Sequence, residues 1–216
     1  MQTSFMKESL ATPVIPKKTV YRLSIYQRCL QRLIENDVST VSSESLAGVA
    51  GVKPTQLRKD LAHFGQFGTR GLGYNVKTLV EMIRDALGRN RLQPVVLVGA
   101  GNLGSALLRY SGFQKEGFEI LAAFDIAAKR GEPRVDGVPI IPQHEMSEFV
   151  NEHDVRMAIL AVPMNAAQGV VDQLVAAGVQ AILNFSPTVV DVPDDVMVKN
   201  VDLAVELENL SYFVRN

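Results

Sequence analysis

The sequence predicts an α/β protein in which a winged helix-turn-helix is followed by a Rossmann-type parallel sheet and a terminal helix. Three observations lead to this prediction. Amphipathic helices and a glycine-rich hairpin fill the first part of the 216 residues, apolar strands alternate with helices from about residue 94, and a glycine-rich turn joins the first of these strands to a helix. We expect one domain over 1–88, a second over 94–200 and a terminal helical segment over 201–216.

The first domain is predicted to contain four helices, because its apolar residues recur at helical spacing. Ser42 or Ser43 caps the second helix, and Pro54 opens the third at a position where a missing N–H costs little. Cys29, the only cysteine, is expected to be a small apolar residue on the first helix. The expected helices cover about 19–36, 43–50, 54–64 and 76–87.

A glycine-rich hairpin is expected over 65–74, where glycine stands at almost every third position. Helices followed by such a hairpin predict a winged helix-turn-helix, with the third helix in the DNA major groove and the hairpin as the wing. The third helix turns Leu57 and Leu61 inward and leaves polar side chains on its other faces. The candidate DNA-binding residues are Gln56, Arg58, Lys59 and His63 of that helix and Arg70 of the wing.

The charge distribution supports double-stranded DNA as a partner of the first domain. Residues 1–92 carry 14 Lys and Arg against 7 Asp and Glu, whereas residues 93–216 carry 8 against 16. A basic segment joined to an acidic one indicates that a polyanion meets only the first. The net charge of short domains also varies widely by chance. The helix-turn-helix pattern within residues 1–88 is therefore what favours a nucleic-acid partner over chance variation.

A dinucleotide site is predicted where an apolar strand at 94–98 runs into a G-x-G-x-x-G turn at 99–104 and then a helix. Asp125 closes a second apolar strand 21 residues after Gly104, where a carboxylate would accept hydrogen bonds from a ribose and repel a 2′-phosphate. NAD(H) is therefore favoured over NADP(H), and a coenzyme A ligand is the alternative. The candidate residues are Gly99, Ala100, Gly101, Asn102, Leu103, Gly104 and Asp125.

The alternation of strands and helices predicts a parallel sheet covered on both faces. Strands are expected at 94–98, 118–124, 155–161, 179–184 and near 196–201, and helices at 102–112, 144–153 and 164–177. Ligands of such sheets lie beyond the carboxyl ends of the strands. The residues expected there, around the nicotinamide, are Ala161, Val162, Pro163, Phe185 and Ser186.

The terminal helix is predicted to begin after Asp202, which caps it. Its apolar stripe could fold back on its own domain or dock on a second subunit. We favour the second interpretation because a helix-turn-helix usually works as a dimer. The stripe consists of Leu203, Leu207, Leu210 and Val214.

The sequence does not favour an enzyme. The histidines (His63, His144 and His153) are expected at the surface, and no Tyr-x-x-x-Lys pair, metal-spaced His/Cys cluster or Ser/His/Asp set is present. Tyr110 could be a proton donor, but no basic residue lies one turn away from it on the expected helix. We expect no catalytic substrate and no metal, although a small NAD-dependent oxidoreductase with a helical cap is an alternative. Strand-length apolar runs and one cysteine predict a cytoplasmic protein without a membrane span.

The chain resembles the redox-sensing transcriptional repressor Rex family over about residues 17–216. The segments that carry the resemblance are 57–61 (LRKDL), 67–74 (FGTRGLGY), 99–104 (GAGNLG), 110–113 (Y-x-G-F), 183–187 (LNFSP) and 200–202 (NVD). The resemblance implies a homodimer that represses genes of anaerobic or fermentative metabolism from an inverted-repeat operator. It implies that NADH releases the repressor and that NAD+ competes and permits binding.

The same resemblance implies roles for single residues. Arg58 and Lys59 would contact the major groove, and Arg70 the minor groove or backbone. Tyr110 and Asp202 match a pair that rearranges, together with Arg28, between the DNA-bound and NADH-bound forms. Terminal helices are exchanged between subunits in this family. Some members carry phenylalanine near the nicotinamide where this chain has Leu203.

A mechanism follows from the difference between the two nucleotides. A ligand shifts a conformational equilibrium only if it binds the two states unequally. An apolar pocket would favour the neutral reduced ring, because burying an unpaired cation is costly. We expect NADH to close the dimer and misplace two recognition helices that must lie about 34–36 Å apart. A tenfold loss of DNA affinity needs only about 1.4 kcal/mol of coupling. A DNA-binding sensor of an acyl-coenzyme A is a weaker alternative.

Overall fold

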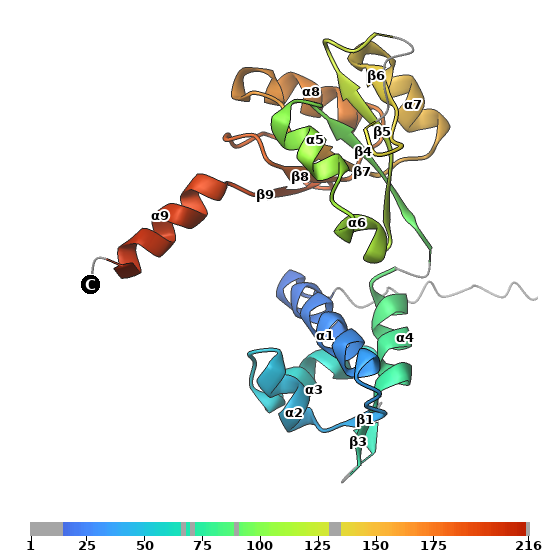
Figure 1. Ribbon diagram of the computed structural model, residues 1–216, viewed down its shortest axis with the longest axis vertical. Coiled ribbons are helices and arrows are strands. Elements are labelled where there is room, and N and C mark those ends of the chain that lie inside the picture. Colours follow the sequence, from blue (N-terminus) through green and yellow to red (C-terminus); the bar gives the residue numbers. More distant parts are fainter. Residues whose placement is uncertain (1–14, 66–67, 70–71, 89–90, 130–134, 215–216) are drawn as a thin grey trace, which may run out of the picture. The chain divides into compact units, whose positions relative to one another are not determined.

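The computed structural model describes residues 15–65, 68–69, 72–88, 91–129 and 135–214 (Figure 1). Residues Met1–Asn90 and Arg91–Asn216 form two compact units, and each is considered by itself. Arg70, the expected wing residue, lies outside the described part of the chain.

The first unit contains the four predicted helices and a small antiparallel sheet. The helices are α1 (Lys17–Glu35), α2 (Ser43–Val49), α3 (Pro54–Ala62) and α4 (Val76–Ala86), and the strands are β1 (Thr40–Val41), β2 (Gly68–Thr69) and β3 (Gly73–Asn75). The strand order is β1-β3-β2, so β2 and β3 form the expected hairpin. Sequence reasoning missed β1, because two residues are too short to show an alternating pattern.

The core of the first unit is built from the inward stripes of these helices. Leu23, Leu30, Leu57 and Ile83 are each at most 1% exposed. Cys29 is buried as expected, and burial raises the pKa of its thiol. The Ser42 side chain accepts a hydrogen bond from the Ser45 N–H at 3.0 Å, which decides between the two candidate caps of α2.

The second unit is a six-stranded, fully parallel sheet. Its strands are β4 (Gln93–Val98), β5 (Phe118–Asp125), β6 (Ile140–Pro142), β7 (Met157–Leu160), β8 (Ala181–Asn184) and β9 (Met197–Asn200). The order is β6-β5-β4-β7-β8-β9, so the chain starts in the middle, moves outward, and returns to the other side of β4. This doubly wound order confirms the predicted Rossmann-type sheet and puts the topological switch point between β4 and β7.

Helices cover the sheet on both faces. The helices are α5 (Asn102–Leu108), α6 (Gly112–Lys115), α7 (Met146–Glu152), preceded by the 3₁₀ turn η1 (Gln143–Glu145), and α8 (Met164–Ala176). Along β4, Val96 and Val98 belong to one core cluster, and Val95 and Leu97 belong to a second cluster on the opposite face. The prediction of one helix over 102–112 was wrong: α5 ends at Leu108, and a turn separates it from α6.

The terminal helix α9 (Leu203–Val214) contains no buried residue. Asp202 Oδ1 accepts from the Ala204 N–H at 2.9 Å, so the predicted cap is present. The stripe residues Leu207 and Leu210 are 69% and 62% exposed, and Phe213 is 75% exposed. Within a single chain this helix therefore does not fold back on its own domain. No helix among the described residues combines the length and the apolar character that crossing a bilayer requires.

Candidate nucleotide site and nucleic-acid interface

The glycine turn after β4 depends on close backbone approaches at the switch point. Gly99 has φ of +96°, and a β-carbon there would lie 2.5 Å from the carbonyl oxygen of Ala161, which follows β7. A β-carbon on Gly104 would overlap the carbonyl oxygen of Gly99, so only glycine lets α5 begin so close to the strand. A β-carbon on Gly101, in contrast, would have no atom within 4 Å, which leaves open space over the turn.

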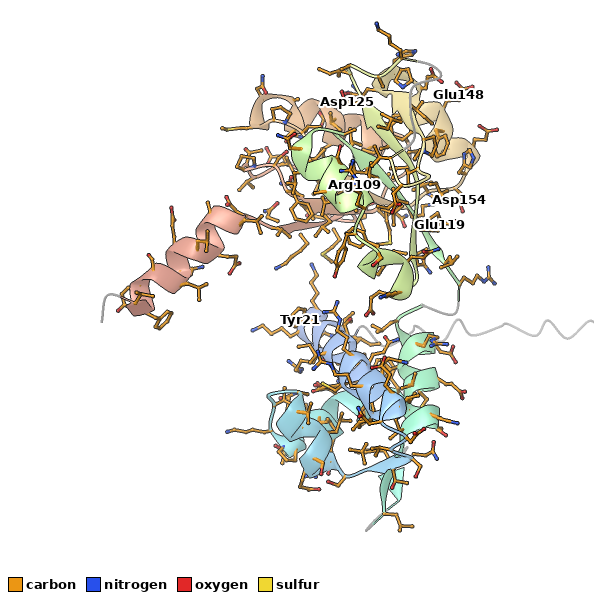
Figure 2. The ribbon with its side chains drawn as sticks, in the orientation of Figure 1. Tyr21, Arg109, Glu119, Asp125, Glu148 and Asp154 are labelled. Carbon is orange, nitrogen blue, oxygen red and sulfur yellow. The ribbon has the colours of Figure 1, made fainter. Side chains whose placement is uncertain are left out.

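The side chain of Asp125, at the end of β5 and next to the start of α5, stabilises this turn through hydrogen bonds (Figure 2). Its Oδ2 accepts from the Ala100 N–H and its Oδ1 from the Ala127 N–H, both at 2.8 Å. The Ser105 hydroxyl donates to the Ala100 carbonyl oxygen at 2.8 Å, so both backbone polar groups of Ala100 are engaged. Each carboxylate oxygen has two lone pairs, and Asp125 can therefore also accept a ribose hydroxyl.

A hollow of ≈ 670 Å³ lies beside Asp125, at the carboxyl ends of β5 and β6. Ile126, which is 87% exposed, and Lys129 form part of its wall together with residues of η1. The hollow lies at the carboxyl edge of the sheet, the edge at which doubly wound folds bind ligands, on the β5 side of the switch point. Sequence reasoning placed only Asp125 here, because the β6 strand and the η1 turn that complete the hollow have no clear sequence pattern.

The loops after β7 and β8 meet at the same edge of the sheet. The Ala161 N–H donates to the Val98 carbonyl and the Phe185 N–H to the Leu160 carbonyl, both at 2.8 Å. The Ser186 hydroxyl donates to the Val162 carbonyl at 2.5 Å. These bonds bring the expected nicotinamide residues together beside Gly99. The Val162 side chain, however, belongs to the core between the sheet and its helices, so Val162 offers a ligand mainly its backbone.

Asn184, at the end of β8, fixes these loops and was missed from the sequence. It is fully buried, and its Nδ2 donates to the Thr188 carbonyl and to Asn200 Oδ1, both at 2.9 Å. Its Oδ1 accepts from the Ser186 N–H at 2.9 Å. Asn184 therefore connects the loop after β8 to the end of β9, two residues before the cap of α9. The only sequence signal was an asparagine at the end of an apolar strand.

Tyr110, an expected switch residue, lies in the turn between α5 and α6. The residue is 59% exposed. Its ring stands edge-on to the Phe113 ring, with 5.1 Å between the ring centroids, and covers Gly112 so closely that any β-carbon there would overlap it. This contact explains the Tyr-x-Gly-Phe sequence. Among the described residues of this single chain, no hydrogen bond joins Tyr110 to Asp202. Arg28 is exposed on α1, in the other unit.

The outer face of α3 carries most of the expected DNA-binding residues. Lys59 and His63 are exposed, and His63 is the C-cap of the helix. Arg58 donates to the Ser43 hydroxyl at 2.7 Å and to Glu44 at 3.2 Å, so it packs against the start of α2. The backbone at the start of α2 and, after it, the Arg58 guanidinium lower the pKa of Glu44. Gln56 turns its amide nitrogen to Asp60, at 2.9 Å.

Asp60 anchors α3 on α1 through a buried ion pair that sequence reasoning missed. Its carboxylate, in a residue only 1% exposed, faces Arg22 at 2.6 Å and 2.7 Å and accepts from the Tyr26 hydroxyl at 2.8 Å. Burial by itself raises the pKa of Asp60, but the hydrogen bonds from Arg22, Tyr26 and Gln56 outweigh it and lower the pKa to about 2. Burial and then Asp60 raise the pKa of Tyr26, so its hydroxyl stays a donor.

Two family models match the two units of the chain. A model described as "CoA binding domain" matches residues 90–188, and a model described as "Putative DNA-binding protein N-terminus" matches residues 14–62. The second match ends with α3, and the first covers the sheet from β4 to β8.

The curated relatives match nearly the whole chain. A redox-sensing transcriptional repressor Rex of Desulforamulus reducens is 49% identical over 198 residues, covering 92% of this chain and 94% of the relative. The Rex protein of Pelotomaculum thermopropionicum is 48% identical, with 92% and 93% of the two chains covered.

Solved structures agree with these relatives. RSP, a Rex-family repressor, in complex with beta-NAD+ and operator DNA superimposes with a TM-score of 0.87 and 36% identity over 93% of both chains. RSP with beta-NADH gives a TM-score of 0.83 and 35% identity, over 93% of this chain and 94% of that one.

A winged helix-turn-helix joined to a Rossmann-type sheet defines a class of protein, the ligand-responsive transcriptional regulators. Within that class, the relatives and the solved structures agree on one family along more than nine-tenths of the chain. The chain belongs to the Rex family of redox-sensing transcriptional repressors.

Proposed function

We propose that this protein is a transcriptional repressor that binds an inverted-repeat operator as a homodimer, senses the NADH/NAD+ ratio, and is released by NADH. The observation that carries the proposal is the glycine turn at the switch point, fastened by Asp125, in the same chain as a winged helix-turn-helix. The solved complexes of RSP with beta-NAD+ and operator DNA and with beta-NADH support it.

The nucleotide site follows from the geometry of the sheet edge. The pyrophosphate would approach the open backbone at Gly101 and its neighbours Ala100, Asn102 and Leu103, and the adenosine ribose would bond Asp125. The adenine would occupy the hollow formed in part by Ile126. The nicotinamide would lie beside the loops after β7 and β8, at Ala161, Val162, Pro163, Phe185 and Ser186, with Tyr110 nearby as a switch residue.

The DNA interface would be the outer face of α3 together with the wing. Lys59 and His63 are already exposed, and Arg58 would exchange its solvent-exposed contact with Glu44 for a DNA group. Such an exchange costs little, because exposed ion pairs contribute little to stability. Arg70 of the wing completes the set.

The homodimer is supported by two complementary apolar surfaces of the second unit. Helix α9 leaves its apolar side chains exposed. A largely apolar hollow of ≈ 250 Å³ opens on the sheet, with Phe113, Ile159 and Leu183 among its lining residues. We assign the α9 helix of a second copy to this part of the subunit interface. Asp202, at the start of α9, and Tyr110 and Arg28 would then form the switch that couples nucleotide to dimer geometry.

The nucleotide is proposed to act as a signal and to undergo no reaction. His153 is exposed at the C-terminus of α7, away from the carboxyl ends of the strands. His144 is exposed in η1, directly after β6, and lines the hollow that the adenine would occupy, so it would lie apart from the nicotinamide. Tyr110, whose hydroxyl could serve as a proton donor, has the Phe113 ring packed against it as its aromatic neighbour. We therefore propose that the protein is not an enzyme and that it acts in the cytoplasm, where its operator and the nicotinamide pool are found.

A coenzyme A ligand is the second candidate, favoured by the description of the matching family model. Lys129, in the wall of the hollow beside Asp125, could meet the 3′-phosphate that coenzyme A has and NAD lacks. Isothermal titration with NADH and with coenzyme A separates the two. The dinucleotide proposal predicts that NADH binds and that Lys129→Ala changes its affinity by less than about twofold.

The proposed function is tested by a gel shift on an inverted-repeat operator, with NADH and then NAD+ added. NADH should weaken binding at least tenfold, and NAD+ should restore it. Lys59→Ala should weaken DNA binding and leave NADH affinity unchanged, whereas Asp125→Ala should lower NADH affinity and give a repressor that responds poorly. A repressor that stays on DNA at saturating NADH would contradict the proposal.

A further inference from the structure

We propose that Asp60 is a positioning residue for DNA readout: it holds the amide nitrogen of Gln56, so that Gln56 offers its carbonyl oxygen to the operator as a hydrogen-bond acceptor. The inference rests on the proposed function, since it assigns a base preference to the recognition helix of that repressor. In the major groove, adenine and cytosine present amino groups. Gln56 should therefore select one of these two bases.

The orientation of the Gln56 amide is set by the charge of its partner. The oxygen and nitrogen of a glutamine amide have the same shape, and hydrogen-bond chemistry decides between them. Asp60 has its pKa lowered to about 2, so its carboxylate is ionised near neutral pH and can only accept. The atom that faces Asp60 Oδ1 at 2.9 Å must therefore be the nitrogen, Nε2.

The Asp60 carboxylate is held rigidly by its other partners. Oδ1 also accepts from the Thr19 hydroxyl at 3.2 Å and from Arg22 Nη2 at 2.7 Å, and Oδ2 accepts from Arg22 Nε and from Tyr26. All these donors except Gln56 belong to α1. Helix α1 thereby fixes the carboxylate, and the carboxylate fixes the Gln56 side chain on α3.

The Gln56 oxygen is left without a protein donor near the N-terminus of α3. Within the described residues, no group donates a hydrogen bond to Gln56 Oε1. Every buried side-chain oxygen of these residues has a hydrogen-bond partner, so an oxygen without one, such as Gln56 Oε1, is in contact with solvent. Gln56 is the third residue of α3, and recognition helices contact base edges with their N-terminal residues. The exposed Lys59 follows one turn later on the same side.

The first experiment selects sequences from a pool of DNA duplexes with a randomised core, using the wild-type chain and Gln56→Met. Methionine keeps the length of the side chain and removes the amide. The wild type should prefer adenine or cytosine about tenfold at one position of each half-site, and Gln56→Met should lose that preference and no other. The neighbouring Thr55→Ala serves as the matched control and should retain it. A wild-type chain that enriches no duplex would contradict the proposed function itself.

The second experiment removes the amino group from the preferred base of the selected duplex. The wild type should bind this analogue about tenfold more weakly, and Gln56→Met should bind both duplexes equally. Asp60→Asn, whose amide can donate or accept, should free Gln56 to turn and abolish the sensitivity to the amino group. The inference is wrong if the analogue leaves wild-type affinity unchanged, or if Gln56→Met weakens every duplex equally. If Asp60→Asn does not fold, hydrogen exchange of the Gln56 side-chain amide in the wild-type chain replaces it as the test. One slowly exchanging hydrogen of that amide supports the role of Asp60, and two rapidly exchanging hydrogens contradict it.

Discussion

Gly101 and Gly104 belong to one turn but leave very different space for a side chain. In Gly104→Ala the new methyl group would overlap the Gly99 carbonyl oxygen, so the turn must shift. We expect the free energy of unfolding to fall by about 1–3 kcal/mol. In Gly101→Ala the methyl group meets no protein atom, and φ of −63° suits alanine, so stability should change by less than about 1 kcal/mol.

The two variants should separate structure from binding. Gly101→Ala keeps the fold but places its methyl group where the pyrophosphate would approach, so NADH affinity should fall at least tenfold. Urea unfolding and fluorescence titration with NADH measure the two quantities. Full NADH affinity in Gly101→Ala would show that the nucleotide does not cross this turn.

The buried carboxylate of Asp60 makes the first unit sensitive to acid. Its pKa is lowered to about 2, below the unfolded value of about 3.9, so the folded state is favoured by its ionisation. This contribution, about 2–3 kcal/mol, is fully present above about pH 4 and is lost as the pH falls toward 2. Denaturant unfolding at pH 5 and at pH 2.5 measures it. In Asp60→Asn this part of the acid sensitivity should disappear, whereas Gln56→Met should retain most of it.

The end of strand β8 depends on Asn184, and its removal should loosen the loops of the nucleotide site. Asn184→Leu keeps roughly the side-chain size but leaves the buried Ser186 N–H without its acceptor, so the free energy of unfolding should fall by about 2–3 kcal/mol. Asn200→Ala removes a single one of these bonds, and since Asn200 is exposed it should cost about 1 kcal/mol or less. An equal fall in the free energy of unfolding in the two variants would show that Asn184 contributes no more than its single bond to Asn200.

Helices and strands with a repeating apolar pattern could be predicted from the sequence. The four helices of the first unit, the hairpin, and strands such as β5 and β7 all lie close to their predicted places. In these elements the apolar residues recur at the spacing of a helix or a strand, because one face of the element is buried. The glycine turn was predicted for the same local reason, since close backbone approach at Gly99 and Gly104 permits no side chain.

Elements and contacts set by distant residues could not be predicted in this way. The turn after α5 brings the Tyr110 ring over Gly112, a contact that no period of hydrophobicity reveals. In the sequence, Asp60 is one more polar position of an amphipathic helix, and only the fold brings Arg22, 38 residues away, to it. The partner of Asn184 is likewise 16 residues away, on another strand.

At the scale of the whole molecule, the exposed helix α9 predicts that the protein works as a dimer. Leu207→Glu places a charge on the apolar side of a helix that is uncovered in the single chain, where Leu207 is 69% exposed. The isolated fold should tolerate it, but burial of the charge in a subunit interface should not be tolerated. Sedimentation should therefore show a shift from dimer to monomer, with an operator affinity at least tenfold lower. The polar-face control Glu208→Gln should remain dimeric, and a dimeric Leu207→Glu would exclude this interface.

The hydrogen bond from Ala100 to Asp125 restricts how the coenzyme preference of such a molecule could change. Replacing the carboxylate by a small neutral residue would relieve its repulsion of a ribose phosphate. The same replacement would remove the acceptor of the Ala100 N–H and unfasten the turn on which the pyrophosphate depends. Retargeting the protein to a phosphorylated coenzyme therefore requires at least two coordinated substitutions, one to admit the extra phosphate and one to supply a new acceptor for the backbone. A single-step evolutionary route would pass through a form that binds both coenzymes poorly.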